Sequence, residues 1–175
     1  MWRSQYEQHK VQWRQTFQGE ESPLPEAQRA GSNGPSFYVY APEWRLTGDL
    51  ERLKGADLKF VSLPATRGKT QDYLEYGHVK VASGADTVSL LVYRPLEHPD
   101  QFFIPFRDAT TGDETYGAGR YVHLDSLDTH KFILDFNNAY NPYCAYDTTW
   151  ICPLTPSGNT LPFAVRAGML APKEP

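Results

Sequence analysis

The stretch FFIPFRDATTGDETYGAGRYVHL, residues 102–124, decides the fold because two apolar runs flank a polar turn. Both runs are rich in aromatic and β-branched residues, and Thr111-Gly112-Asp113 supplies turn formers between them. The pattern predicts a pair of antiparallel strands. The later residues 133–168 are rich in glycine, proline and aromatic residues and are expected to be mostly irregular. Because elaborate connections on a rigid scaffold often carry binding groups, we expect the functional site in this third of the chain.

Short β-branched and aromatic runs, bounded by turn formers, continue outward from this hairpin to residue 37. The turn Ser83-Gly84-Ala85-Asp86 joins two of them as a second hairpin. Strand-rich segments at this spacing favour a barrel or sandwich. The expected strands span residues 44–53, 58–63, 72–82, 87–94, 101–106, 116–124, 131–136 and 161–167.

The N-terminal residues carry a different pattern. Trp2, Tyr6, His9, Trp13 and Phe17 recur at steps of three or four, which predicts an amphipathic helix over residues 2–18. The fold class is therefore mainly β, a single-domain barrel or curved antiparallel sheet of about seven or eight strands, with this helix packed on it. The 175 residues divide into a helix and connector at 1–36, a β-rich core at 37–168 and a tail at 169–175.

Charge and composition exclude several classes of protein. The net charge of −4 provides no basic field for a phosphate backbone, so we expect no nucleic-acid partner. No leader-like run opens the chain and no apolar stretch reaches membrane length, so the expectation is a cytoplasmic protein without a membrane partner. Residues 97–150 hold nine carboxylates against three basic residues. That excess reads either as a solvated acidic face or as an attraction for a cation.

The predicted hairpin at 106–121 offers the first candidate site. Gly117 and Gly119 lie two apart in the expected second strand, so both leave one face bare, and either a ligand or another backbone segment approaches there. Arg107 and Arg120 could bind a carboxylate or phosphate, or they could pair with carboxylates of the turn. A dinucleotide fingerprint is excluded because the third glycine and the following helix are missing.

The loop at 135–152 offers the second candidate site. Its tyrosines and Trp150 either pack the loop against itself or form the aromatic wall of a pocket, with asparagine side chains as polar groups. Both alternatives stay open. The candidate ligand-binding residues of hairpin and loop are Arg107, Tyr116, Gly117, Gly119, Arg120, Asp135, Asn137, Tyr140, Asn141, Tyr143 and Trp150.

Cys144 and Cys152 are separated by seven residues, a spacing that matches neither a redox CxxC motif nor a zinc knuckle. Packed, reduced thiols are the default interpretation. A disulfide, a nucleophilic cysteine beside a histidine, and a metal site completed by His123 or another histidine are the alternatives. Familiar motifs for hydrolases, phosphate loops, zinc proteases and calcium loops do not occur.

The strings PFRDATTGDETYGAGRYVHLD and LDFNNAYNPYCAYDTTWICPLTPSGNTLPFAVRAG closely resemble the prokaryotic family catalogued as domain of unknown function 1684. The segments at 22–25 and 40–46 and the Tyr76-Gly77 turn also match its pattern, so the resemblance spans nearly the whole chain. It implies that hairpin and loop belong to one unit, and it implies no reaction, substrate or cofactor. The residues that match the family's motifs are Phe106, Arg107, Asp108, Thr115, Tyr116, Gly117, Gly119, Arg120, Tyr121, Asp135, Phe136, Asn137, Ala139, Tyr140, Asn141, Pro142, Cys144 and Cys152.

The leading hypothesis is a protein that binds a small polar or anionic molecule between the hairpin at 106–121 and the loop at 135–152. Arg120 would hold the polar or anionic group, while Asp135 and Asn137 would orient it. Two alternatives belong to other classes. One is a metal-dependent hydrolase that uses Cys144 and Cys152 with a histidine, and the other is an interaction module that docks through the N-terminal helix or a sheet edge. Enzyme status, cofactor and oligomeric state stay open.

Overall fold

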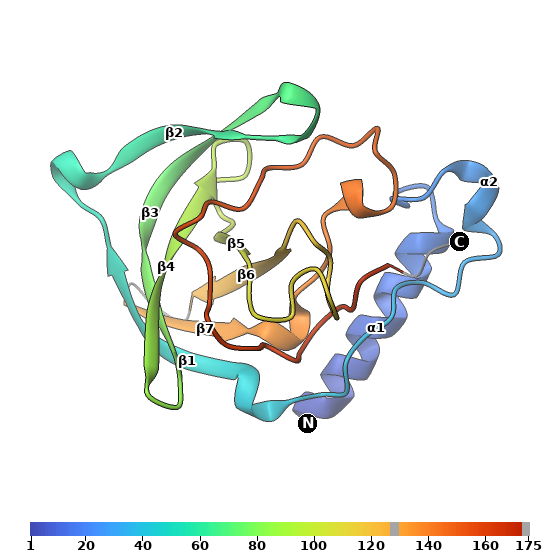
Figure 1. The fold of residues 1–175 in the computed structure, drawn as a ribbon, viewed down its shortest axis with the longest axis horizontal. Helices are drawn as coiled ribbons and strands as arrows, with labels where there is room; N and C mark the ends of the chain where they lie inside the picture. Colours follow the sequence, from blue (N-terminus) through green and yellow to red (C-terminus); the bar gives the residue numbers. More distant parts are fainter. Residues whose placement is uncertain (127–129, 173–175) are drawn as a thin grey trace.

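Six antiparallel strands close into a barrel in the computed structural model, which describes residues 1–126 and 130–172 (Figure 1). The barrel order is β1-β7-β6-β5-β4-β3, and a pairing between β1 and β3 closes it. β2 adds a seventh strand outside the ring by pairing with β3. The mainly-β prediction is confirmed. The strands are β1 (Arg45–Arg52), β2 (Lys59–Pro64), β3 (Thr70–Ser83), β4 (Asp86–Pro95), β5 (Phe103–Phe106), β6 (Arg120–Ser126) and β7 (Lys131–Asp135).

β1 closes the barrel by changing partners along its length. Its first half pairs with β7, whereas Leu50 and the two residues after it pair with β3. At this crossing a Cβ on Gly77 would lie 2.8 Å from the Glu51 carbonyl oxygen, so only glycine allows the two backbones to approach so closely. A register shift between Glu75 and Gly77 also bends β3 there. β3 therefore pairs with β2 through its first half and with β1 through its second half, while β4 pairs with both halves.

Strands β3 to β6 carry buried residues on both faces, because successive side chains point to opposite sides. The inward face fills the barrel with apolar residues such as Val92, Ile104 and Val122, all fully buried. The outward face of β3 to β6 carries a second apolar layer of larger, mostly aromatic residues. This outer layer comprises Tyr73, Tyr93, Phe103 and Tyr121, together with Leu63 from β2 and with Cys144 and Cys152 from the segment that covers them.

The N-terminal helix α1 (Trp2–Gln18) forms as predicted and runs alongside the barrel (Figure 1). Its aromatic stripe packs on the segments around the barrel: Trp13 lies 5.5 Å from Tyr140 and Phe17 lies 4.8 Å from Tyr146, measured between ring centroids. No helix of the described residues is long and apolar enough to cross a membrane. The other helical segments are α2 (Glu26–Arg29), η1 (Pro42–Trp44), η2 (Gly55–Asp57), η3 (Thr66–Gly68), η4 (Phe136–Asn138) and η5 (Tyr143–Ala145).

Two strand predictions were wrong. Residues 116–119 belong to the turn, since β6 begins only at Arg120, and residues 161–167 form no strand. Three backbone carbonyls at Val165, Ala167 and Met169 accept hydrogen bonds from the Arg120 guanidinium, so this segment satisfies its backbone through a side chain rather than a ladder. The last three residues of the predicted tail at 169–175 lie outside the described part of the chain.

Candidate ligand-binding site

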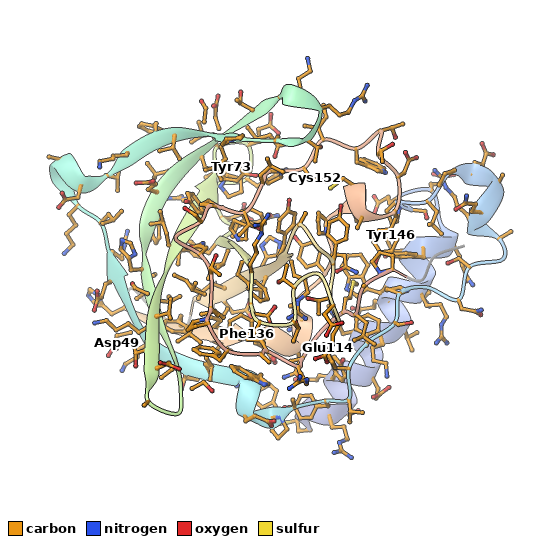
Figure 2. All side chains as sticks on the ribbon, viewed as in Figure 1. Asp49, Tyr73, Glu114, Phe136, Tyr146 and Cys152 are labelled. Atoms are coloured by element: carbon orange, nitrogen blue, oxygen red, sulfur yellow. The ribbon has the colours of Figure 1, made fainter. Side chains whose placement is uncertain are left out.

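A cavity of about 940 Å³ lies on the outer face of the barrel. Strands β3 to β6 form its floor, residues 138–153 form the opposite wall, and α1 contributes His9 and Trp13 at one edge. Figure 2 labels two residues that line it: Tyr73 on β3 and Cys152 in the covering segment. The other lining residues are Thr70, Gln71, Asp72, Pro95, Leu96, Glu97, His98, Gln101, Phe103, Tyr121, His123, Asp125, Asn138, Tyr140, Pro142, Tyr143, Trp150, Ile151 and Pro153.

Aromatic rings run along the cavity as one connected row. Trp13 of α1 meets Tyr140 at 5.5 Å between ring centroids, and Tyr140 stacks on His123 at 5.7 Å with an interplanar angle of 8°. His123 lies 6.0 Å from Phe103, which stacks on Tyr73 at 5.6 Å. Rings at these separations support one another's orientation. The row therefore provides a preorganised apolar wall.

The pair His123 and Tyr140 brings a polar group into the middle of this row. The His123 Nε2 atom lies 2.9 Å from the Tyr140 hydroxyl oxygen. Burial lowers the pKa of His123, although a backbone hydrogen bond at Phe102 and the charge of Asp125 act in the opposite direction. Burial also raises the pKa of Tyr140. Near neutral pH the pair is therefore an uncharged imidazole and an uncharged phenol, which can accept or donate a hydrogen bond to a bound molecule.

Tyr140 is held in place by the backbone. Its N–H donates to the Tyr121 carbonyl and its carbonyl accepts from the Tyr121 N–H, both at 2.9 Å, in a single antiparallel bridge to β6. The Tyr121 hydroxyl donates to the Pro153 carbonyl, which ties the far end of the covering segment to the same strand. The cavity wall is therefore attached to the barrel at both ends.

Three residues predicted for the site line this cavity: Tyr140, Tyr143 and Trp150. The rings of Tyr143 and Trp150 meet edge to face at 5.1 Å. The Trp150 indole N–H donates to the Pro23 carbonyl at 3.0 Å, so the connector after α1 supports this part of the wall. The aromatic half of the predicted site is thus gathered at one place.

Arg120 lies elsewhere, in the interior, with 1% of its surface exposed. Besides the three carbonyls of the C-terminal segment, its guanidinium contacts Asp108 at 3.4 Å. The Asp108 carboxylate in turn accepts hydrogen bonds from Thr110 and from the Val165 N–H. These partners occupy both terminal nitrogens of Arg120, which favours a structural role over the expected ligand-binding role.

The side chains of Asp135, Asn137 and Asn141 also form hydrogen bonds with the backbone. Asp135 accepts from the Asn137 N–H at 3.0 Å and lies 3.5 Å from the Arg45 Nε. Asn137 exchanges two hydrogen bonds of 2.9 Å with the backbone of Ala41. The Asn141 amide donates to the Leu170 carbonyl at 2.8 Å. None of the three predicted polar residues lines the cavity.

The remaining residues of the predicted hairpin site lie outside the cavity as well. A Cβ on Gly119 would come within 2.6 Å of the Phe106 carbonyl oxygen and 2.7 Å of Thr155 Oγ1, so the close approach predicted there is made by the protein itself. A Cβ on Gly117 would meet nothing nearer than 3.9 Å. Arg107 is exposed and Tyr116 is half-buried, and neither is a lining residue.

Cys144 and Cys152 are free, buried thiols that lie against each other, with the Cys144 N–H 3.2 Å from Cys152 Sγ. Hydrogen bonds from the Cys152 thiol and the Tyr116 hydroxyl lower the pKa of Cys144 to about 7, while the same pairing and burial raise the pKa of Cys152. Within residues 1–126 and 130–172, no three histidine, cysteine or acidic side chains gather closely enough to hold a metal. The metal-dependent hydrolase hypothesis therefore gains no support from the described residues.

Sequence reasoning missed most of the cavity floor. The sequence assigns Tyr73, Phe103 and Tyr121 to strands and offers His123 only as a metal candidate. The sequence signal for this floor is alternation, because the aromatic residues at 103, 121 and 123 alternate with the aliphatic residues at 104, 122 and 124. Such alternation indicates that both faces of a strand are covered, but it does not say by what.

The family described as "Protein of unknown function (DUF1684)" matches residues 32–169. The chain is also similar to a solved structure, the solution NMR structure of the uncharacterised protein from gene locus rrnAC0354 of Haloarcula marismortui. The two chains share 31% sequence identity and a TM-score of 0.74, over 97% of this chain and 94% of the other. No curated protein matches this sequence.

Proposed function

The chain belongs to the DUF1684 family, whose description assigns no function, and from the cavity we propose that it is a cytoplasmic protein that binds a small molecule with an aromatic group. The connected row of rings from Trp13 to Tyr73 is the observation that carries this proposal. Aromatic side chains that already stack on one another offer further ring faces to a flat ligand. The two unpaired thiols support a reducing compartment.

The size of the cavity also supports this function. Pockets for small molecules commonly measure about 300 to 1,000 Å³ and combine apolar walls with a few polar groups. A cavity of about 940 Å³ reaches the upper part of that range. His123, Tyr140 and Gln71 are the polar groups that would orient a ligand on this wall.

Thermal unfolding and NMR titration with a panel of benzyl and phenethyl compounds test the proposal. We expect at least one compound to raise the melting temperature and to perturb the resonances of the cavity wall. The double variant Tyr143→Ala with Trp150→Ala removes two lining rings and should abolish this effect. Phe60→Ala is the matched control, because Phe60 is an exposed ring on β2 that does not line the cavity.

Two results would count against the binding function. One is a panel in which no compound binds the native protein. The other is binding that persists in the double variant with unchanged affinity, which would place the site elsewhere.

A further inference from the structure

We propose that the ligand of this cavity carries a positive charge, an inference that rests on the proposed binding function. Asp72 on β3, Glu97 after β4 and Asp125 on β6 all line the cavity. No lysine or arginine of the described chain is among the lining residues. The carboxylates come from three different segments, so the fold gathers around one space a charge that is dispersed in the sequence.

The three carboxylates are exposed, and their charge has no ion-pair partner in the described part of the chain. Asp72 accepts a hydrogen bond from the uncharged Ser62 hydroxyl at 2.5 Å. Of the three lining histidines, His9, His98 and His123, burial lowers the pKa of His9 and His123, so these two add no compensating charge near neutral pH. A bound cation would therefore replace a missing counter-charge.

Two of the three carboxylates, Glu97 and Asp125, act electrostatically on residues of the aromatic row. Burial above all, and with it the charges of Cys152 and Glu97, raise the pKa of Tyr73 to about 12. Asp125 acts on His123 in the middle of the same row. A cation placed over the faces of these rings is attracted by their electron density as well as by the carboxylates. Ring faces and negative charge in one cavity are the combination that recognises organic ammonium groups.

The alternative of an anionic ligand has lost its binding groups. Arg120, the arginine expected to hold an anion, is buried with both terminal nitrogens hydrogen-bonded to the protein. Arg107 does not line the cavity. An anion would enter a space with three carboxylates and no opposing guanidinium or ammonium group among the described residues, which is unfavourable at short range.

Three probes of nearly equal size test the inference: phenethylammonium, 2-phenylethanol and phenylacetate, which are cationic, neutral and anionic at pH 7. NMR titration of the full chain should give the tightest binding for phenethylammonium and the weakest for phenylacetate. Asp125→Asn should weaken the binding of the ammonium probe by about three- to fivefold and leave the alcohol unchanged, as expected for one partly solvated carboxylate. Raising the salt concentration should weaken the binding of phenethylammonium and not that of 2-phenylethanol or phenylacetate.

Asp86→Asn is the matched control, because Asp86 is an exposed carboxylate at the opposite end of the β3–β4 hairpin, outside the cavity. It should leave all three affinities unchanged. Equal affinities for ammonium and alcohol, or a preference for phenylacetate, would overturn the charge inference while the binding function stands. Failure of all three probes together with the wider aromatic panel would overturn both.

Discussion

The inner and outer faces of β5 and β6 are built from neighbouring residues but have different chemistry. Ile104 and Val122 point inward and are fully buried in the barrel core. Phe103 and Tyr121, one position earlier, point outward and line the cavity. The inner face thus packs into the barrel core, whereas the outer-face rings are buried but border the cavity. A binding function can develop on the outer face without disturbing the core.

The largest expected effect comes from breaking the interior network. Arg120→Met introduces an apolar side chain in place of the guanidinium. It leaves three backbone carbonyls and the buried Asp108 carboxylate without their hydrogen-bond donor. We expect a loss of about 3 to 5 kcal/mol in the free energy of unfolding, measured by chemical denaturation. Arg107→Met, at the exposed position next to Asp108, should change the stability by less than about 0.5 kcal/mol. Near-native stability of Arg120→Met would show that the interior does not depend on this network.

The next effect concerns the contact between the C-terminal segment and η4. Gly168 has φ of 77°, and a Cβ there would lie 2.5 Å from the Ala139 carbonyl oxygen. Gly168→Ala should therefore cost about 2 to 3 kcal/mol in the free energy of unfolding. Gly158→Ala is the matched control, because a Cβ at that position meets no atom within 4 Å and its φ is not in the left-handed region. Equal stabilities of the two variants would contradict the tight packing described at this contact.

A smaller effect is expected on the outer face and depends on pH. Because burial lowers the pKa of His123 in the folded protein, the unfolded chain binds this proton first as the pH falls. The free energy of unfolding should therefore decrease as the pH drops below about 6.5, the ordinary value for histidine. His123→Gln should reduce this decrease. At pH 8 the imidazole is neutral in both the folded and the unfolded state, so the free energy of unfolding at that pH is the reference for each protein. An identical pH dependence in both proteins would refute the assignment.

The smallest effect involves reactivity rather than stability. Since the pKa of Cys144 is lowered to about 7, its alkylation by iodoacetamide should become rapid at a lower pH than for an ordinary thiol. Mass spectrometry of the labelled peptides should show Cys144 reacting before Cys152, whose pKa is raised. Cys152→Ala removes the thiol that stabilises the Cys144 thiolate and should move the midpoint upward. Preferential labelling of Cys152 would reverse the assignment of the two thiols.

The local elements were largely predictable, because short-range rules decide them. The spacing from Trp2 to Phe17 predicts α1, and turn formers at 83–86 predict the β3–β4 hairpin, as observed. The predicted strand at 161–167 failed for a long-range reason: its apolar residues are buried, but Arg120 supplies the hydrogen bonds that a neighbouring strand would otherwise provide. Residues 161–167 thus have buried apolar side chains without forming a paired strand.

The candidate site was predictable only in its aromatic part. Tyr140, Tyr143 and Trp150 stand out because rings crowd an irregular segment, and they line the cavity. Arg120 and Asn137 stand out in the sequence because they are polar residues among turn formers. In the structure, however, their side chains donate hydrogen bonds to the backbone. From the sequence alone a buried polar residue that binds a ligand and one that binds the backbone look alike, because both need hydrogen-bond partners.

By itself, the sequence determined the mainly-β class, the amphipathic helix, the family resemblance and the aromatic character of the covering segment, because periodicity and turn chemistry act over a few residues. Only the tertiary structure decided which polar groups face the cavity. Asp72 on β3, Glu97 after β4 and Asp125 on β6 lie far apart in the sequence. They line one cavity only after β3 to β6 pair side by side. Strand order and register therefore set the charge of the site.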